Sequence, residues 1–181
     1  RAFEMLLERY VQLSVPDHIR QKSPVLAGLQ PFGSQFCRAV LDLLQAEEHD
    51  RIKLGLWGAS ELTGCLDNEG SIHEPPERKM IDRRTRGPLF SAQMDQGALE
   101  HMTRLLGRLV RHSDADLRAW AIHILKRLPV GPHLADLRAC LHDEDDYTRV
   151  EAMHTLAGLG DLGCAQMLIA CVQETDGKIQ R

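Results

Sequence analysis

An interval of 31 residues organises the C-terminal half of the chain. Aspartates and apolar residues recur at this spacing in three series: Asp114, Asp145 and Asp176; Leu106, Leu137 and Leu168; Val110, Leu141 and Val172. Self-similarity at a fixed period of this size is typical of a solenoid, whose units bury their apolar faces only by stacking on their neighbours. The interval therefore predicts an array of stacked repeats.

Each repeat has the pattern of two helices joined by a short acidic turn. In the first repeat, apolar residues at helical spacing predict helices over 98–111 and 117–128. Asp114 is the predicted N-cap of the second helix, because its side chain can accept a bond from a free N–H group of the first turn. Gly158 and Gly160 are predicted to end the second helix of the next repeat. The remaining helices are predicted over 133–142, 147–159 and 162–174.

The register L-x-D-x-D-x-x-x-R-x-x-A-x-x-x-L-x-x-L-G-D, read from Leu141 to Asp161, resembles the HEAT-like repeat family. More specifically, it is similar to the short repeats of phycobilisome-lyase-type proteins. The preceding unit shares this register at Arg118, Ala121, Leu125 and Leu128, but has His112 in place of one loop aspartate. The resemblance covers about residues 98–176 and implies an all-α fold, an α-solenoid of stacked antiparallel helix pairs. Such a motif specifies a fold well and a function hardly at all.

The chain is expected to have three parts. Residues 1–66 form a helical segment, with helices over 2–14, 36–47 and 51–63; Ser34 is the predicted N-cap of the middle one, and the last two are interpreted as a degenerate repeat. Residues 67–96 form a basic connection containing prolines and glycines, which we expect to be partly flexible because loops this long in a compact array are functional or disordered. Residues 97–181 hold the repeats of period 31, of which the last is incomplete.

Composition narrows the classes of partner. The net charge is −4 and aromatic residues make up 4% of the chain. Domains that bind nucleic acid through its phosphates are normally basic, so the negative net charge argues against nucleic acid as a partner. No apolar run approaches 18 residues, so no membrane span is expected.

The five cysteines form no C-x-x-C pair. Cys140 and Cys171 occupy equivalent apolar positions in two repeats, and we interpret both as small core residues, because free cysteine is among the most buried residue types. Unpaired cysteines suit a reducing compartment, so we expect the protein to be cytoplasmic.

No motif in the sequence demands an enzyme. Phosphate-binding glycine loops, nucleophile elbows and zinc-ligand spacings are all missing, so we assign no catalytic residue, cofactor or metal ligand. His123 and His154 are equivalent in the two repeats, but no third ligand follows the same period, and we interpret both as helix surface.

The pairs Asp114 with Arg118 and Asp145 with Arg149 also recur at the repeat interval. In the repeat family that the chain resembles, an aspartate of the turn and an arginine of the second helix commonly form a ladder between neighbouring units. Arginine suits this role because its planar fork can bond carboxylates and carbonyls of adjacent units at once. We therefore interpret these pairs as structural.

The leading hypothesis is a non-enzymatic scaffold or adaptor that binds another protein. Its predicted contact face lies on the second helices and consists of Arg118, Ala119, Ile122, His123, Lys126, Arg127, Glu151 and His154. Ile122 is expected to be exposed, because it lies off the apolar stripe that contains Trp120, and exposed apolar residues form interface cores. A second contact is predicted in the basic run of Arg78, Lys79, Arg83, Arg84 and Arg86.

Two alternatives come from the resemblance. One is a chromophore-lyase-like or chaperone-like enzyme subunit, which would need an apolar pocket on the concave side of the solenoid. The other is a DNA-binding HEAT-like protein with a basic groove. Acidic residues near Lys126 and Arg127 offset the positive charge that a phosphate-binding groove needs, so the sequence disfavours DNA as a partner.

Overall fold

The computed structural model describes residues 1–12, 25, 28–63, 94–161 and 164, and the regular elements in these ranges are all helices. The chain divides into two compact units, Arg1–Leu105 and Leu106–Arg181. The division falls inside helix α5 (Gln96–Leu109). The segmentation at residues 66 and 96 stays a prediction, since most of the connection lies outside the described residues. Among the helices that the structure describes, none has the length and apolar character needed to span a bilayer.

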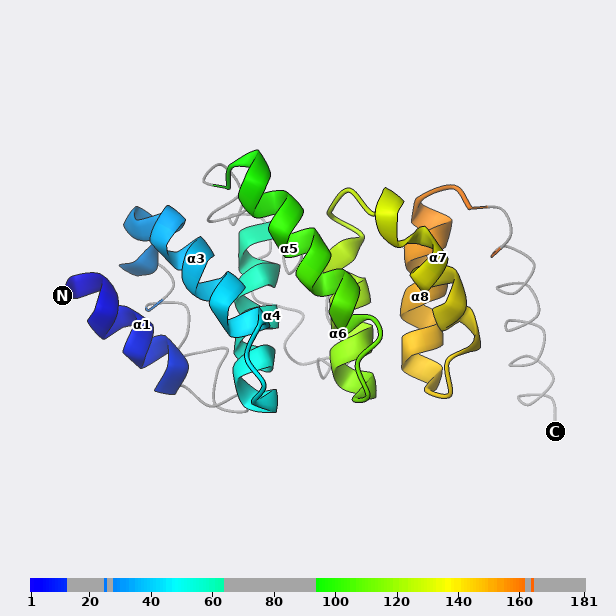
Figure 1. Ribbon diagram of the computed structural model, residues 1–181, viewed down its shortest axis with the longest axis horizontal. Coiled ribbons are helices and arrows are strands. Elements are labelled where there is room, and N and C mark those ends of the chain that lie inside the picture. The colour runs from blue at the N-terminus through cyan, green and yellow to red at the C-terminus, as the bar shows by residue number, and fades with distance from the viewer. Residues whose placement is uncertain (13–24, 26–27, 64–93, 162–163, 165–181) are drawn as a thin grey trace, which may run out of the picture. The chain divides into compact units, whose positions relative to one another are not determined.

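Unit 1 contains α1 (Ala2–Gln12), a 3-10 turn (Gln30–Phe32), α3 (Gly33–Leu44), α4 (His49–Thr63) and most of α5. Figure 1 shows α3 crossing α4. The two helices pack closely because glycines of α4 face α3: a Cβ at Gly55 would lie 2.8 Å from the backbone nitrogen of Leu44, and one at Gly58 would lie 2.4 Å from Val40 Cγ2.

The N-terminal helix is anchored by a buried tyrosine. Tyr10 is fully buried, and its hydroxyl donates to the carbonyl of Leu54 in α4 at 2.9 Å. Its ring meets Phe36 of α3 edge-on, with centroids 5.5 Å apart. The helices predicted over 2–14, 36–47 and 51–63 are thus confirmed within a few residues. The prediction that Ser34 is an N-cap is wrong: α3 begins at Gly33, one residue earlier, and the N-cap position has no side-chain hydrogen bond.

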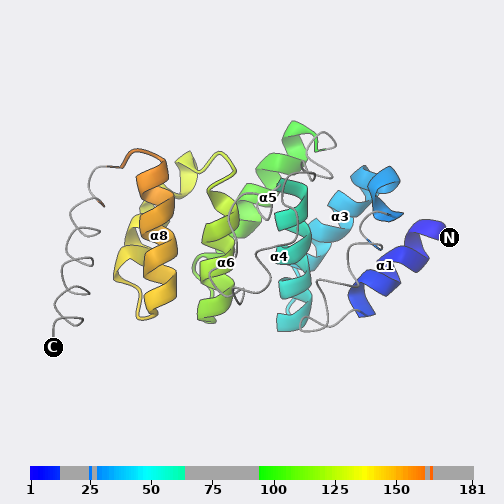
Figure 2. The same ribbon diagram turned by 180° about the vertical axis from the view of Figure 1, so that it is seen from behind.

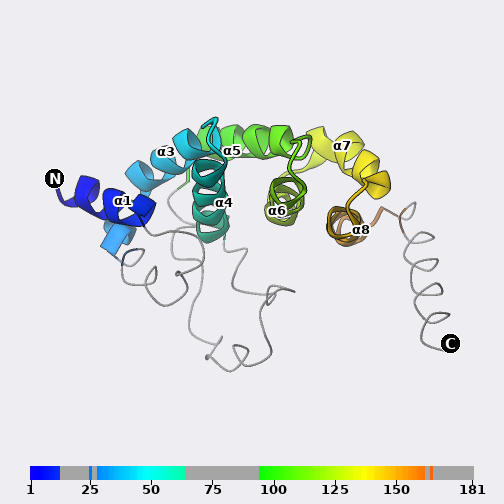
Figure 3. The same cartoon turned by 90° about the horizontal axis from the view of Figure 1, so that it is seen from below.

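Unit 2 contains the end of α5, α6 (Ala115–Leu125), a 3-10 turn (Gly131–His133), α7 (Leu134–Ala139), a second 3-10 turn (Cys140–His142) and α8 (Asp146–Gly158). Helices α6 and α8 lie side by side in one layer, and α7 lies in the other (Figure 3). Residues one interval apart are buried together: Leu106 and Leu137, Val110 and Leu141, Ala121 and Ala152, Leu125 and Leu156. The predicted all-α, solenoid-like stacking of helix pairs is confirmed.

Local signals place the ends of the second helices. Asp114 accepts from the N–H of Leu117 at 3.1 Å, which confirms it as the N-cap of α6, and Asp145 does the same for α8. At the other end of α8, Gly160 has a φ of +75°, which glycine adopts without the strain that a Cβ imposes. The N–H of Asp161 then reaches the carbonyl of Leu156 at 2.9 Å, closing a Schellman motif. Gly158 lies within α8, and the helix predicted over 162–174 falls outside the described residues except for one position.

Alanine substitution at two glycines tests the close approach in unit 1. Gly55→Ala should lower the free energy of unfolding by about 1–3 kcal/mol, because the new methyl group meets backbone that must shift. Gly158→Ala is the control: a Cβ there meets nothing within 4 Å, and alanine should stabilise α8 by up to about 1 kcal/mol. Urea unfolding of both variants measures the difference, and equal midpoints would contradict the packing.

Candidate functional site

An arginine of each second helix folds back onto the turn that precedes it. Arg118 Nη1 donates to the carbonyls of His112 and Ser113, both at 2.9 Å. Arg149 Nη1 donates to the two equivalent carbonyls of its own turn, at 2.6 and 3.1 Å. The same bonds one interval apart show that each turn and its arginine form a repeated module.

Arg118 also joins its repeat to the next one. Its Nε and Nη2 donate to the two carboxylate oxygens of Asp143, at 2.9 and 2.6 Å, in the bidentate geometry that arginine forms with carboxylates. The two side chains are only 9% and 12% exposed. Burial alone would raise the pKa of Asp143, but the bonds from Arg118 and from the backbone N–H of Asp145 outweigh it and lower the pKa below its ordinary value. The pair is therefore ionised at neutral pH.

This contact corrects one detail of the predicted ladder. An arginine–carboxylate bridge between neighbouring repeats is present, but its acid is Asp143. Asp114 and Asp145, which the sequence suggested, cap α6 and α8 instead. The physical reason is that each of these carboxylates accepts from an N–H group in the first turn of its own helix, Asp114 from Leu117 and Asp145 from Thr148.

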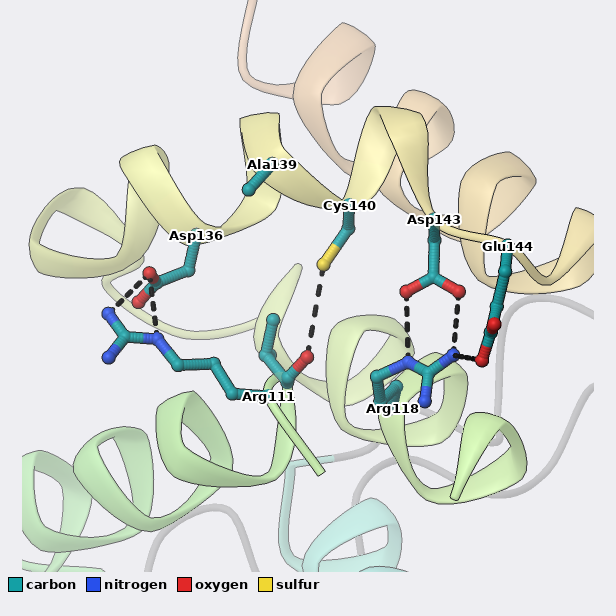
Figure 4. Close-up of a pocket in the computed structure, with 8 residues that line it drawn as sticks. Arg111, Arg118, Asp136, Ala139, Cys140, Asp143 and Glu144 are labelled. Carbon is teal, nitrogen blue, oxygen red and sulfur yellow. Dashed lines mark hydrogen bonds and ion pairs between the residues drawn. The ribbon is translucent and has the colours of Figure 1, made fainter. Parts of the chain in front are cut away.

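The junction borders a cleft of about 500 Å³ in unit 2. Figure 4 shows Arg118 with Asp143 and Glu144 at one end of it, and Arg111 with Asp136 at the other. Arg111 Nε donates to Asp136 at 2.9 Å. The arginines that line the cleft are thus both bound to carboxylates of the same cleft, and we assign it to the joint between repeats.

The cysteine in this cleft is a core residue. Cys140 is 7% exposed, and its sulfur lies 3.9 Å from the carbonyl of Val110. Burial raises the pKa of the Cys140 thiol to about 11, so it stays protonated and unreactive at neutral pH. The core assignment is confirmed for Cys140; Cys171 lies outside the described residues.

A row of polar and aromatic residues follows the second helices and is here called the α6–α8 face. It consists of Asp116, Trp120 and His123 on α6, of Arg127 in the turn that follows α6, and of Tyr147, Glu151 and His154 on α8. Within each helix the residues are spaced by four and then by three positions, which puts each set on one side of its helix. Asp116, Trp120 and His123 are equivalent to Tyr147, Glu151 and His154 across the 31-residue interval, and Figure 2 shows the two helices side by side.

A buried carboxylate binds the two helices of this face together. Glu151 is 2% exposed, and its Oε2 lies 3.0 Å from His123 Nδ1. Burial alone would raise the pKa of Glu151, but the bond to His123 and the charges of His123, Lys126 and His154 outweigh it, so the pKa is lowered. Burial, followed by the charge and hydrogen bond of Glu151, raises the pKa of the Tyr147 hydroxyl to about 12. Glu151 is therefore an ionised, buried acceptor for both neighbours.

The structure corrects part of the predicted contact face. Ile122 and Ala119 are fully buried, so the expectation that Ile122 is exposed is wrong. Helix α6 packs on neighbours over more of its circumference than one apolar stripe. Trp120, assigned to the buried stripe, is instead half-buried on the α6–α8 face.

The remaining predicted contact residues divide into three groups. Arg118 and Glu151 are buried in bonds between repeats. His123 and Lys126 are half-buried, whereas Arg127 and His154 are exposed. The basic run Arg78, Lys79, Arg83, Arg84 and Arg86 lies outside the described residues. Within the described ranges, no group of His, Cys, Asp and Glu side chains could hold a metal ion.

The bond between His123 and Glu151 was missed from the sequence. The two residues are 28 positions apart, which is one interval less one helical turn. That separation is the signal that could have found the pair, because a side chain on one second helix can meet its neighbour one turn away from its own equivalent.

Comparison with known families agrees with this arrangement. The family pattern of HEAT repeats matches residues 102–181, so this part of the chain is HEAT-like. The finer resemblance to phycobilisome-lyase-type repeats stays a prediction. No curated protein and no solved structure matches the chain significantly.

The same substitution in two arginines tests the joint between repeats. Arg118→Met should lower the free energy of unfolding by about 3–5 kcal/mol, because it leaves the Asp143 carboxylate buried without its partner. Arg111→Met is the control and should cost at most about 1 kcal/mol, because the Arg111 side chain is 72% exposed. Urea unfolding compares them, and similar losses would show that the buried pair has no special role.

The buried carboxylate of the α6–α8 face gives a pH dependence. A lowered pKa in the native state stabilises the fold fully above the unfolded value of about 4.3, and this contribution is lost as the pH falls through the native value. The stability lost in Glu151→Gln should therefore be at its full value above about pH 5 and should shrink as the pH falls below about 4. Unfolding across this range measures it, with Glu47→Gln at an exposed position as the control. A pH-independent difference would contradict the assignment.

Proposed function

We propose that this chain is a non-enzymatic helical-repeat scaffold or adaptor that binds another protein through the α6–α8 face. HEAT repeats, which match residues 102–181, generally serve as protein-interaction scaffolds. No residue of the chain is assigned a catalytic role, and the described chemistry of unit 2 is that of contacts between repeats.

The observation that carries the proposal is the composition of the α6–α8 face. Arg127 and His154 are exposed there, and Trp120 and Tyr147 are half-buried. Tryptophan, tyrosine and arginine are the residues most enriched among interface hot spots, because they combine a large apolar surface with a polar group. A face that gathers these three types on two adjacent helices and the turn after α6 suits a protein partner.

The bond between Glu151 and His123 supports this use of the face. It holds α6 to α8 across the line of contact residues, so the two helices can present one surface with little freedom to lose. Preorganised surfaces bind more tightly because less conformational entropy is lost on association. The chromophore-lyase-like, chaperone-like and DNA-binding alternatives stay predictions, and no contact among the described residues favours them.

Charge reversal tests the proposed face. Lys126→Glu with Arg127→Glu should reduce capture of partner proteins, from cells that express the chain, at least about tenfold, equivalent to a loss of about 1.4 kcal/mol. Arg104→Glu with Arg108→Glu is the matched control, because both of these residues are exposed on α5. Unchanged capture by the α6 variant would contradict the proposal.

A second variant separates binding from folding. Lys126 lies close enough to Glu151 to influence its pKa, so reversal there can also disturb the buried pair. Arg127→Glu alone avoids this, because Arg127 is exposed. The single variant should keep the circular dichroism spectrum and melting temperature of the wild type while capturing less of the partner proteins.

A further inference from the structure

We infer that the partner of the α6–α8 face is a protein segment carrying a carboxylate close to an apolar side chain. The inference rests on the proposed function and narrows it to one class of partner. Its basis is the exposed Arg127 and the half-buried Lys126 at one end of the face, together with two half-buried aromatic side chains on α6 and α8.

The positive charge gathers around a carboxylate that does not face solvent. His123, Lys126 and His154 all act to lower the pKa of Glu151, against the effect of its burial. Glu151 is 2% exposed and accepts from His123 at 3.0 Å. Its negative charge is therefore buried against His123, whereas Arg127 is exposed in the turn that follows α6. This end of the face attracts anionic groups.

The aromatic side chains lie toward the other end. Trp120 lies in the middle of α6, and Arg127 follows two residues after the helix ends at Leu125. Tyr147 is half-buried on α8, with its hydroxyl bound to Glu151, so its ring is held in place. An apolar side chain can rest on these rings while a carboxylate of the same segment reaches Arg127.

The acidic end of the face determines the class of partner. Asp116 is exposed on the same side of α6 as Trp120, one turn toward its N-terminus. Uniformly charged phosphates running along the face would meet this carboxylate and lose what they gain at Arg127. A protein segment with a single acidic end avoids the repulsion. The charges therefore favour an acidic and apolar peptide over nucleic acid.

Tryptophan fluorescence tests the inference directly. The chain has two tryptophans, so Trp57→Phe leaves Trp120 as the only reporter. The probe is a short synthetic peptide of glutamate and leucine, compared with the same peptide in which lysine replaces glutamate. The acidic peptide should change the Trp120 emission to saturation, more weakly at high salt, where exposed charges are screened. The basic peptide should leave it unchanged.

Neutral substitutions in the same background provide the control. Arg127→Gln should weaken the binding of the acidic peptide at least about fivefold, equivalent to about 1 kcal/mol. Arg108→Gln, at an exposed position of α5, should have no effect. Circular dichroism of each variant establishes that the helices are retained.

Several results would overturn the inference. It fails if the basic peptide changes the emission as strongly, if the acidic peptide binds Arg127→Gln unchanged, or if it does not bind at all. It also fails if a thymidine oligonucleotide binds more tightly through Arg127, which would favour the DNA-binding alternative. Partner capture that depends on Arg127, combined with no binding of the acidic peptide, would leave the scaffold standing and remove only the acidic partner.

Discussion

The bidentate contact between Arg118 and Asp143 is the interaction on which the described repeats depend. Burying two charges is costly unless their hydrogen-bonding groups are satisfied. Here Nη1 of Arg118 is bound by two carbonyls of its own turn, while Nε and Nη2 hold the carboxylate of the next turn. One side chain therefore organises its own turn and joins it to its neighbour, so the geometry inside a repeat and the stacking between repeats are coupled.

The α6–α8 face follows from that coupling. With the turns joined at one end and the aliphatic interior packed behind them, α6 and α8 lie side by side with equivalent residues in register. The register brings Glu151 to His123, and the resulting bond adds a second polar contact between the helices. Both contacts bury carboxylates whose pKa values are lowered by their partners, so ionised acids help to hold the repeats together.

Function and architecture use different parts of the same charged surface. The arginines of the cleft in Figure 4 are bound to acids of neighbouring repeats, which assigns them to the joint. On the α6–α8 face Glu151 is buried, whereas Arg127 and Asp116 are exposed to solvent. A scaffold of this kind would recognise partners by charge and aromatic contact on a face whose shape is already set.

The sequence alone determined the repeats, because a period of 31 residues, N-cap aspartates and a C-terminal glycine act within one helix pair or between equivalent positions. Helix ends in unit 2 and the buried aliphatic residues could be predicted for that reason. Only the tertiary structure decided which side chains cross between repeats. The rotation of α6 buries Ile122 and leaves Trp120 half-exposed, and Asp143 rather than Asp145 reaches Arg118. A repeat interval establishes which residues are equivalent, but the packing of whole helices sets the direction in which each one points.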